Sequence, residues 1–294
     1  MLDQETASSF DHVRKCVTDA FSTGEIHPKL ITRPGGRFLE RVRNAAAILA
    51  DNDGTVTSGA SWAAVGQYLG DSHAEDERKD REWYYNHAHL EQSADRWADR
   101  ALKDDSDWAA AEGAWGARTI IRLANAGVTR EQIRVAGATL TMRAGVRELL
   151  GRHLHRTIIT FGIADVVNGF LRAYCLPQTE VTGFQLTYRD NGAVSGHHPG
   201  SVVTRACKGK AAQRFLTSRG LRPEQSFSVF DSVVDRRLIL PGGTSLLLVP
   251  GTEPNRALHR FRDMHVETLW NEGLDAVLVD NGFTGFNKLL NSAS

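Results

Sequence analysis

The chain has 294 residues, 41% hydrophobic and 24% charged, a composition typical of a soluble globular protein with one or two domains. Lysine plus arginine equals aspartate plus glutamate at 35 each, so the net charge gives no sign of a nucleic-acid polymer or an anionic membrane as partner. Three widely spaced cysteines argue against a disulfide framework, and neither a signal-peptide start nor an apolar run of roughly 20 residues occurs, so we expect a cytoplasmic protein.

The first acidic motif follows a short apolar run. Residues 10–43 have amphipathic helix patterns on either side of the break HPKLITRPGG, and the run AAAILA at 45–50 then ends in a cluster of Asp, Gly and Thr. This order favours a buried strand that ends at Asp51. Asp51 and Asp53 raise each other's pKa unless a cation or a hydrogen-bond network offsets the repulsion. The pair is therefore either an acidic turn or a functional site.

The rest of the chain predicts an α/β fold with an insertion. Residues 62–142 contain no proline and have helix-period patterns, which indicates several helices. Strand and helix patterns then alternate, with a turn signal at 190–192 between two short strand-like runs. The expected strands are 157–161, 226–230, 245–250 and 275–279, and the expected helices are 145–151, 164–174, 209–220 and about 255–273. Such alternation predicts a Rossmann-like three-layer sandwich, with a parallel sheet covered on both faces.

Four polar features fall at the carboxyl ends of the predicted strands, where open parallel sheets bind ligands. They are the Asp51–Asp53 pair, Thr160 with the loop Phe161-Gly162, a lysine (Lys208 or Lys210) at a helix start, and Asp231 with Asp235. Clustered carboxylates favour Mg²⁺, which binds oxygen ligands and shares a phosphate. One carboxylate would attack phosphorus, and the other would protonate the leaving oxygen and later deprotonate water. A hydroxyl and helix-start N–H groups complete a phosphate cradle.

These four motifs, in this order, resemble the haloacid dehalogenase (HAD) superfamily of phosphatases. The helical insertion is similar to that family's helical cap of the first type, which places a catalytic core at 1–60 and 143–294 and a cap at 61–142. Around the second motif, the stretch AGVRELLGRHLHRTIITFGIADVV is similar to pyrimidine 5′-nucleotidases and phosphoserine phosphatases. Two other stretches, EWYYNHAHL and TGFQLTYRDNGAVSGHHPG, are similar to the cytosolic pyrimidine 5′-nucleotidase branch.

The resemblance implies a role for each motif. Asp51 is expected to be the nucleophile and Asp53 the general acid and base. Thr160, the Phe161-Gly162 loop and Lys208 are expected to bind phosphate. Mg²⁺ is expected to bind Asp51, the backbone carbonyl of Asp53 and Asp231. In the fourth motif Asp235 would orient the lysine or a metal-bound water, and Ser232 would support that loop.

Other interpretations remain open. An isolated Asp-x-Asp-Gly is more often a turn, and the alternative role of Asp235 is a surface ion pair with the arginines that follow it. Phe230 replaces the usual glycine of the family, Asn52 replaces an apolar residue, and Phe161 replaces a small one. A protein that binds phosphate without turnover is therefore an alternative.

The expected function is Mg²⁺-dependent hydrolysis of a small phosphomonoester. A nucleoside monophosphate is the first candidate substrate, and phosphoserine or a biosynthetic intermediate is the alternative. The aromatic residues of the insertion mostly have helix-packing spacing, but an aromatic pocket with a few polar groups is also what a nucleobase requires. The candidates for that pocket are Trp62, Tyr85, His89 and Glu91.

Overall fold

The structure, a computed structural model, describes most of the chain. It covers residues 2–22, 25–35, 37–87, 105–176, 178–251 and 266–292, without the side chains of 85–87 and 105–108. The chain folds into two compact units. Unit 1 consists of Met1–Asp51, Arg143–Arg156 and Ala212–Ser294, and unit 2 of Asn52–Met142 and Thr157–Ala211. The predicted division into a core and a cap stays a prediction.

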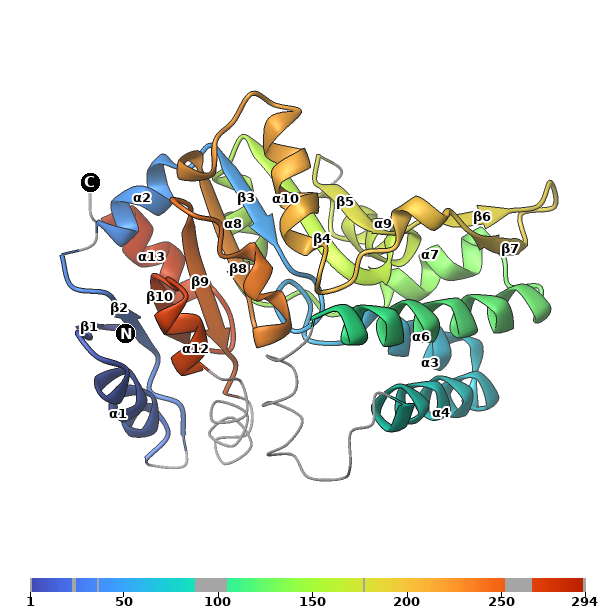
Figure 1. Cartoon of the computed structure of the whole chain (residues 1–294), viewed down its shortest axis with the longest axis horizontal. Helices are drawn as coiled ribbons and strands as arrows, with labels where there is room; N and C mark the ends of the chain where they lie inside the picture. The colour runs from blue at the N-terminus through green and yellow to red at the C-terminus, as the bar shows by residue number, and fades with distance from the viewer. Residues whose placement is uncertain are drawn as a thin grey trace. The chain divides into compact units, whose positions relative to one another are not determined.

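Unit 1 is built on a mostly parallel sheet. Its strands, in sheet order, are β1 (Asp3–Thr6), β2 (Lys29–Thr32), β10 (Ala276–Val279), β9 (Thr244–Val249), β8 (Ser226–Phe230) and β3 (Ala47–Ala50). The pair β2–β10 is antiparallel, whereas β1–β2, β10–β9, β9–β8 and β8–β3 are parallel. Strands β8, β9 and β10 lie side by side in Figure 1. These three and β3 are buried at every position, so each reads as a short continuous apolar run, as predicted.

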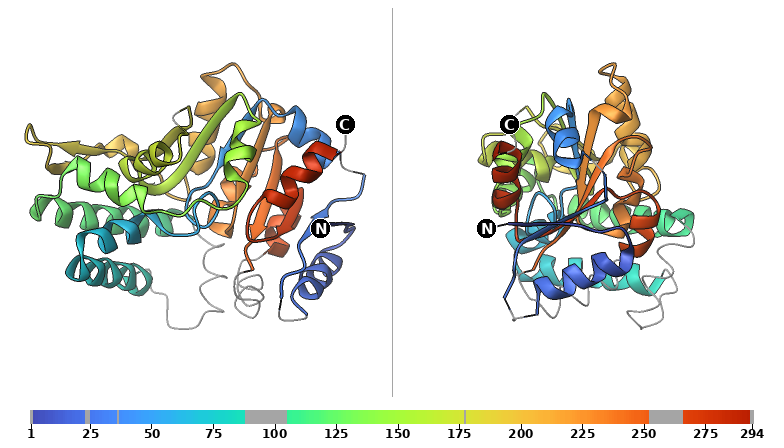
Figure 2. Two further views of the ribbon diagram at one scale, coloured as in Figure 1. Left: turned by 180° about the vertical axis from the view of Figure 1, so that it is seen from behind. Right: turned by 90° about the vertical axis from the view of Figure 1, so that its left-hand side faces the viewer.

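Helices cover both faces of this sheet. The helices of unit 1 are α1 (Phe10–Ala20), α2 (Phe38–Asn44), α8 (Val146–Gly151), α12 (Val266–Asn271) and α13 (Thr284–Ser292). In Figure 2, α2 and α13 lie on one face and α12 on the other, which confirms the layered arrangement predicted from the sequence. The helix expected over about 255–273 is present as α12, and residues 252–265 lie outside the described part of the chain.

A buried histidine fixes where the chain turns from α8 into the next strand. Nδ1 of His153 lies 2.9 Å from the carbonyl oxygen of Ala45, just before β3. Burial lowers the pKa of His153, which favours the neutral ring with its Nδ1–H donating to that carbonyl. The backbone N–H of His155, the first residue of β4 (His155–Ile163), donates to Ala46 at 3.0 Å.

Unit 2 contains the predicted helical insertion. Its helices are α3 (Ser61–Leu69), α4 (Asp71–His87), α6 (Asp105–Asn125), α7 (Arg130–Ala138) and α9 (Ala164–Ala173). Strand β4 pairs in parallel with β5 (Glu180–Phe184), and β6 (Leu186–Tyr188) forms an antiparallel hairpin with β7 (Val194–His197). The hairpin confirms the turn predicted at 190–192. Helix α10 (Lys208–Thr217) begins in unit 2 and ends in unit 1.

Helices α7 and α9 cross at two glycines. A Cβ atom at Gly137 on α7 would lie 1.9 Å from the carbonyl oxygen of Val166, and one at Gly169 on α9 would lie 2.1 Å from that of Arg134. Real Cβ atoms do not approach backbone oxygens so closely. The two backbones can therefore touch only because both positions lack a side chain.

The structure corrects the predicted end of the second-motif strand. The sequence predicts a strand that ends at Thr160 or Phe161, with a loop at Phe161-Gly162 leading into the next helix. In the structure β4 continues to Ile163, but its register against β5 shifts between Ile159 and Ile163. The bulge takes the place of the loop, because a bulge releases residues from regular pairing without ending the strand.

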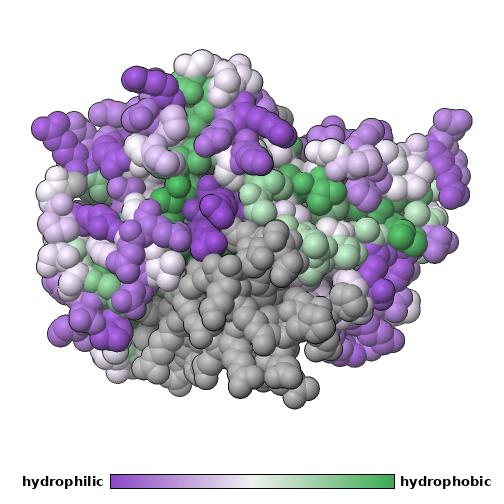
Figure 3. Space-filling view, in the orientation of Figure 1, coloured by the Kyte–Doolittle hydropathy of each residue, from purple (hydrophilic) through white to green (hydrophobic). Residues whose placement is uncertain are grey.

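The surface is mostly polar where it is described. On the face drawn in Figure 3, hydrophilic side chains predominate and apolar ones form smaller patches among them. Exposed large hydrophobic side chains include Tyr68, Ile121, Val135 and Leu154. Among the described residues, the helices are too short or too polar to cross a membrane.

Candidate active site

Three carboxylates gather in unit 1. Asp51 follows β3, Asp231 follows β8, and Asp235 lies in the short 3₁₀ helix η3 (Val233–Leu238). One carboxylate oxygen from each of the three lies within 4.8 Å of the others, and all three side chains are at least 96% buried. We call these three residues the carboxylate trio.

The parallel pairing of β3 and β8 brings the first two members of the trio together. Ala50 pairs with Val229, and the backbone N–H of Asp51 donates to the carbonyl of Val229 at 3.0 Å. Asp51 and Asp231 therefore leave neighbouring strands at the same edge of the sheet.

A capped turn brings in the third member. Ser232 precedes η3, and its side chain accepts from the backbone N–H of Val234 at 3.4 Å. The N–H of Asp235 donates to the carbonyl of Ser232 at 3.1 Å, so one turn of chain returns Asp235 to Asp231. Asp235 is buried, so it is not the exposed carboxylate that a surface ion pair with the following arginines would require. Arg236, the next residue, forms an ion pair with Glu272 at 3.4 Å.

The trio has the donor set of a divalent cation site. Two unit charges 4.8 Å apart repel by about 3.5 kcal/mol at an effective dielectric constant of about 20. A divalent cation offsets this repulsion, and three carboxylates supply the hard oxygen ligands that Mg²⁺ prefers. The residues present therefore fit Mg²⁺.

The second aspartate of the first motif lies in a tight turn of unit 2. The carbonyl oxygen of Asn52 accepts backbone hydrogen bonds from Thr55, Val56 and Thr57 at 2.9–3.2 Å. Gly54 has φ of +90°, a conformation that favours glycine. The motif is thus also a turn, so the two interpretations of its sequence are compatible.

Ser61 holds the carboxylate of Asp53. The backbone N–H of Ser61 donates to one oxygen of Asp53 at 3.0 Å, and its hydroxyl donates to the other at 3.0 Å. The side-chain amide of Asn52 donates to the same carboxylate at 2.5 Å. Ser61 is fully buried at the first turn of α3. Sequence reasoning missed this residue, because a serine at a helix start signals the helix and not its partner.

The bulge of β4 lies against the same serine. The N–H of Gly162 donates to the hydroxyl oxygen of Thr160 at 2.9 Å. A Cβ at Gly162 would lie 2.1 Å from the hydroxyl oxygen of Ser61 and 3.1 Å from that of Thr160. Glycine is therefore required here by close approach, and Asp53, Ser61, Thr160 and Gly162 form one contiguous group in unit 2.

The structure separates the two candidate lysines. Lys208 is the first residue of α10 and is 96% buried, whereas Lys210 is exposed.

Sequence reasoning missed a buried ion pair just before helix α10. Nε of Arg205 lies 2.6 Å from Glu112 on α6, and another of its nitrogens donates to the hydroxyl of Tyr84 on α4 at 2.8 Å. These partners are 93 and 121 residues away along the chain, so no local pattern could predict them.

An aromatic cluster adjoins the bulge in unit 2. The rings of Trp62, Trp115, Phe161 and Phe184 have centroids 5.3–6.1 Å apart in five pairs. Tyr84 stacks on Trp115 at 5.0 Å. Trp62 and Phe184 are buried, and Phe161 and Trp115 are partly exposed. The other predicted pocket residues lie outside the described part of the chain. This applies to the side chain of Tyr85 and to the whole of His89 and Glu91.

Comparison with solved structures identifies the fold. No model of a protein family and no curated protein matches the sequence. A HAD family hydrolase from Salmonella enterica subsp. enterica serovar Typhi has a TM-score of 0.52 and 13% identity, over 69% of this chain and 63% of that one. This chain thus spans less than two thirds of that structure.

Two further structures are covered almost completely. Cytosolic 5′-nucleotidase IIIB bound to cytidine has a TM-score of 0.56 and 16% identity, over 87% of this chain and 88% of that one. A phospho-aspartyl intermediate analogue of phosphoserine phosphatase has a TM-score of 0.52 and 15% identity, over 84% of this chain and 99% of that one. The chain therefore has the HAD fold, which confirms the predicted fold class.

Proposed function

We propose that the protein is a Mg²⁺-dependent phosphomonoester hydrolase that works through an aspartyl-phosphate. The carboxylate trio carries this proposal: three buried acids stand where parallel strands end, in the fold of phosphatases and nucleotidases. Burying three carboxylates this close together is costly to the fold unless cations or hydrogen-bond donors compensate their charge.

The proposed metal ligands are Asp51, the backbone carbonyl of Asp53 and Asp231, with Asp235 supporting them. When bound, Mg²⁺ would neutralise the charge on the phosphoryl oxygens and offset the repulsion between Asp51 and the substrate. The remaining chemistry belongs to side chains of the protein.

In the first step, a carboxylate oxygen of Asp51 attacks phosphorus while the bond from phosphorus to the leaving oxygen breaks. Asp53 gives its proton to that oxygen, and the alcohol departs. In the second step, Asp53 takes a proton from water, the water oxygen attacks phosphorus, and the bond to Asp51 breaks to release inorganic phosphate. Ser61 keeps the Asp53 carboxylate oriented through both steps.

The phosphate cradle of this proposal consists of Thr160, the Phe161-Gly162 bulge and Lys208. The hydroxyl oxygen of Thr160 already accepts from Gly162, which leaves its O–H to donate to a phosphoryl oxygen. Burial of Lys208 and exposure of Lys210 favour the first of the two lysines for this role.

The proposed substrate is a nucleoside monophosphate. Phe161 belongs both to the bulge and to the aromatic cluster, so an aromatic group carried by a bound phosphoester can stack beside the phosphate. The indole N–H groups of Trp62 and Trp115 are buried and have no hydrogen-bond acceptor among the described residues. A nucleobase offers a flat ring together with acceptor atoms.

Phosphate release from a panel of phosphomonoesters tests this function. The panel contains pyrimidine and purine 5′-monophosphates, phosphoserine, a sugar phosphate and a generic aryl phosphate, each with Mg²⁺ and with a chelator. We expect hydrolysis that requires Mg²⁺ and is fastest for a nucleoside monophosphate. Hydrolysis of phosphoserine alone would leave the chemistry standing and overturn the substrate. Binding of Mg²⁺ and phosphate with no hydrolysis on the panel would favour the non-catalytic alternative.

Replacement of Phe161 by leucine tests the stacking. Because stacking on an aromatic ring contributes about 1–3 kcal/mol per base, we expect KM for the best nucleotide to rise about tenfold. KM for phosphoserine or a sugar phosphate should stay within about twofold. Phe21→Leu, a buried ring of unit 1 outside the aromatic cluster, is the matched control. An equal rise for all substrates would count against a base-stacking role.

A further inference from the structure

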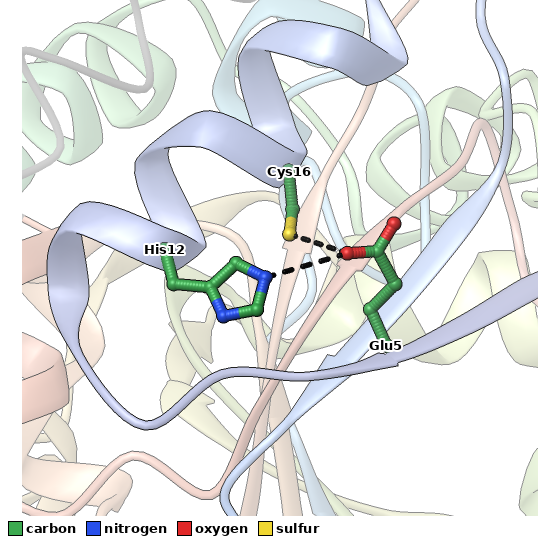
Figure 4. Close-up of side chains that lie close together, drawn as sticks. All are labelled: Glu5, His12 and Cys16. Carbon is green, nitrogen blue, oxygen red and sulfur yellow. Dashed lines mark hydrogen bonds and ion pairs between the residues drawn. The ribbon is translucent and has the colours of Figure 1, made fainter.

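Unit 1 contains a second group of metal-ligating side chains, which the proposed reaction does not use. Figure 4 shows Glu5 on β1, with His12 and Cys16 on α1, all turned toward one another. One atom from each residue can act as a ligand, and these three atoms lie within 4.8 Å of one another. We call these residues the Glu–His–Cys cluster.

Helix geometry explains the convergence. His12 and Cys16 are four residues apart on α1 and therefore project from the same face of the helix. Glu5 meets this face from β1. Its Oε2 atom accepts a hydrogen bond from the Cys16 thiol at 2.8 Å and lies 3.6 Å from Nε2 of His12. One carboxylate oxygen thus faces both the sulfur and the imidazole nitrogen.

We propose that the Glu–His–Cys cluster binds a divalent transition-metal ion, with Zn²⁺ as the best match. A thiolate, an imidazole and a carboxylate oxygen are the three ligand types that Zn²⁺ accepts, and water takes the fourth tetrahedral position in sites with three protein ligands. The His12 side chain is 43% exposed, so the ion can enter from solvent, while Cys16 is 98% buried.

Lys29 orients the carboxylate in this proposal. Its ammonium donates to Oε1 of Glu5 at 2.5 Å, and this leaves Oε2 directed at the other two residues. Partners that hold a ligand's second oxygen commonly fix ligand orientation in metal sites. Lys29 lies on β2, next to β1, so the neighbouring strand supplies this support.

A reactive cysteine is the competing explanation, and the surroundings of the thiol oppose it. The Cys16 thiol is 98% buried and donates its hydrogen bond to a carboxylate, whereas reactive cysteines lie in partly exposed, electropositive surroundings.

The site is chemically distinct from the carboxylate trio. The trio offers oxygen alone and favours hard Mg²⁺, whereas sulfur and nitrogen ligands favour softer ions. The two groups share no residue, so binding at one can be tested while the other is saturated. The Glu–His–Cys cluster can therefore bind its ion whether or not the protein is a phosphatase.

Titration with Co²⁺ in excess Mg²⁺ tests the proposal on the full chain. Co²⁺ replaces Zn²⁺ in such sites, and a thiolate ligand gives a charge-transfer absorption that an all-carboxylate site cannot give. We expect this absorption to saturate at one Co²⁺ per chain and to disappear when Zn²⁺ is added. His12→Ala should weaken binding by more than about tenfold. Cys16→Ser should abolish the absorption.

Two cysteine variants provide matched controls. Cys175→Ser and Cys207→Ser change the other cysteines of the chain and should leave the absorption unchanged. His12 is partly exposed, so His12→Ala remains informative even if the buried Cys16→Ser variant fails to fold. The proposal is overturned if the wild-type protein gives no thiolate absorption. It is also overturned if the absorption survives in folded Cys16→Ser or if His12→Ala binds Co²⁺ as tightly as wild type.

Discussion

Asp51→Asn is expected to lower kcat by at least about 10³-fold on the best substrate while leaving the fold intact. Asparagine matches the shape of aspartate but carries no negative charge, so it cannot attack phosphorus to form the covalent intermediate. The variant also removes one of three buried charges that lie within 4.8 Å of one another. Without Mg²⁺, thermal stability should therefore stay equal or rise, because repulsion in the trio decreases.

A nucleophile that is also part of a repulsive trio should lose activity on this substitution without losing thermal stability, so both quantities are measured. Phosphate release is measured with saturating Mg²⁺, and thermal unfolding is followed by circular dichroism without it. Asp280→Asn is the matched control, because Asp280 follows β10 as Asp51 follows β3 but lies outside the trio. Burial raises the pKa of Asp280, so the control also changes a partly buried carboxyl. Retention of more than about a tenth of the activity in Asp51→Asn would remove this residue as nucleophile.

Gly137→Ala is expected to destabilise the protein by about 3 kcal/mol, a large effect for a single methyl group. The new Cβ would fall 1.9 Å from the carbonyl oxygen of Val166, so α7 and α9 would have to move apart. Gly169→Ala should act similarly, because its Cβ would meet the backbone of Arg134 at 2.1 Å. Backbone cannot rotate away as a flexible side chain can.

Gly113→Ala is the matched control for this crossing. Gly113 lies inside α6, and a Cβ there would meet nothing within 4 Å. Alanine has the higher helix propensity, so this variant should be more stable by about 0.5–1 kcal/mol. Urea unfolding followed by circular dichroism compares the three variants with wild type. Equal stabilities for Gly137→Ala and Gly113→Ala would show that close backbone contact between α7 and α9 at Gly137 does not stabilise the fold.

Local patterns were sufficient to predict the central elements of the fold. Strands β3, β8, β9 and β10 are buried at every position and appear in the sequence as short apolar runs between turn residues. The hairpin turn and the helices of the insertion also have local signals. By contrast, β1 has the sequence DQET and is mostly exposed. It escaped prediction because a polar edge strand has no apolar periodicity.

For the active site too, the sequence predicted some features and left others to the tertiary structure. The order of the motifs predicted that Asp51, Asp231 and Asp235 lie close together, because acids that follow parallel strands leave the sheet at the same edge. Their separation and burial, however, depend on the pairing of β3 with β8 and on the turn capped by Ser232. No spacing along the chain contains that information.

Contacts between distant residues were decided by tertiary structure alone. Ser61 binds Asp53 because α3 begins beside the turn of the first motif, and Arg205 meets Glu112 across 93 residues of chain. The Glu–His–Cys cluster likewise required β1, a strand that the sequence did not reveal. Apolar periodicity and turn chemistry are properties of neighbouring residues, so a sequence displays them directly. The partners of a polar side chain depend on how separate elements pack, which only the folded chain determines.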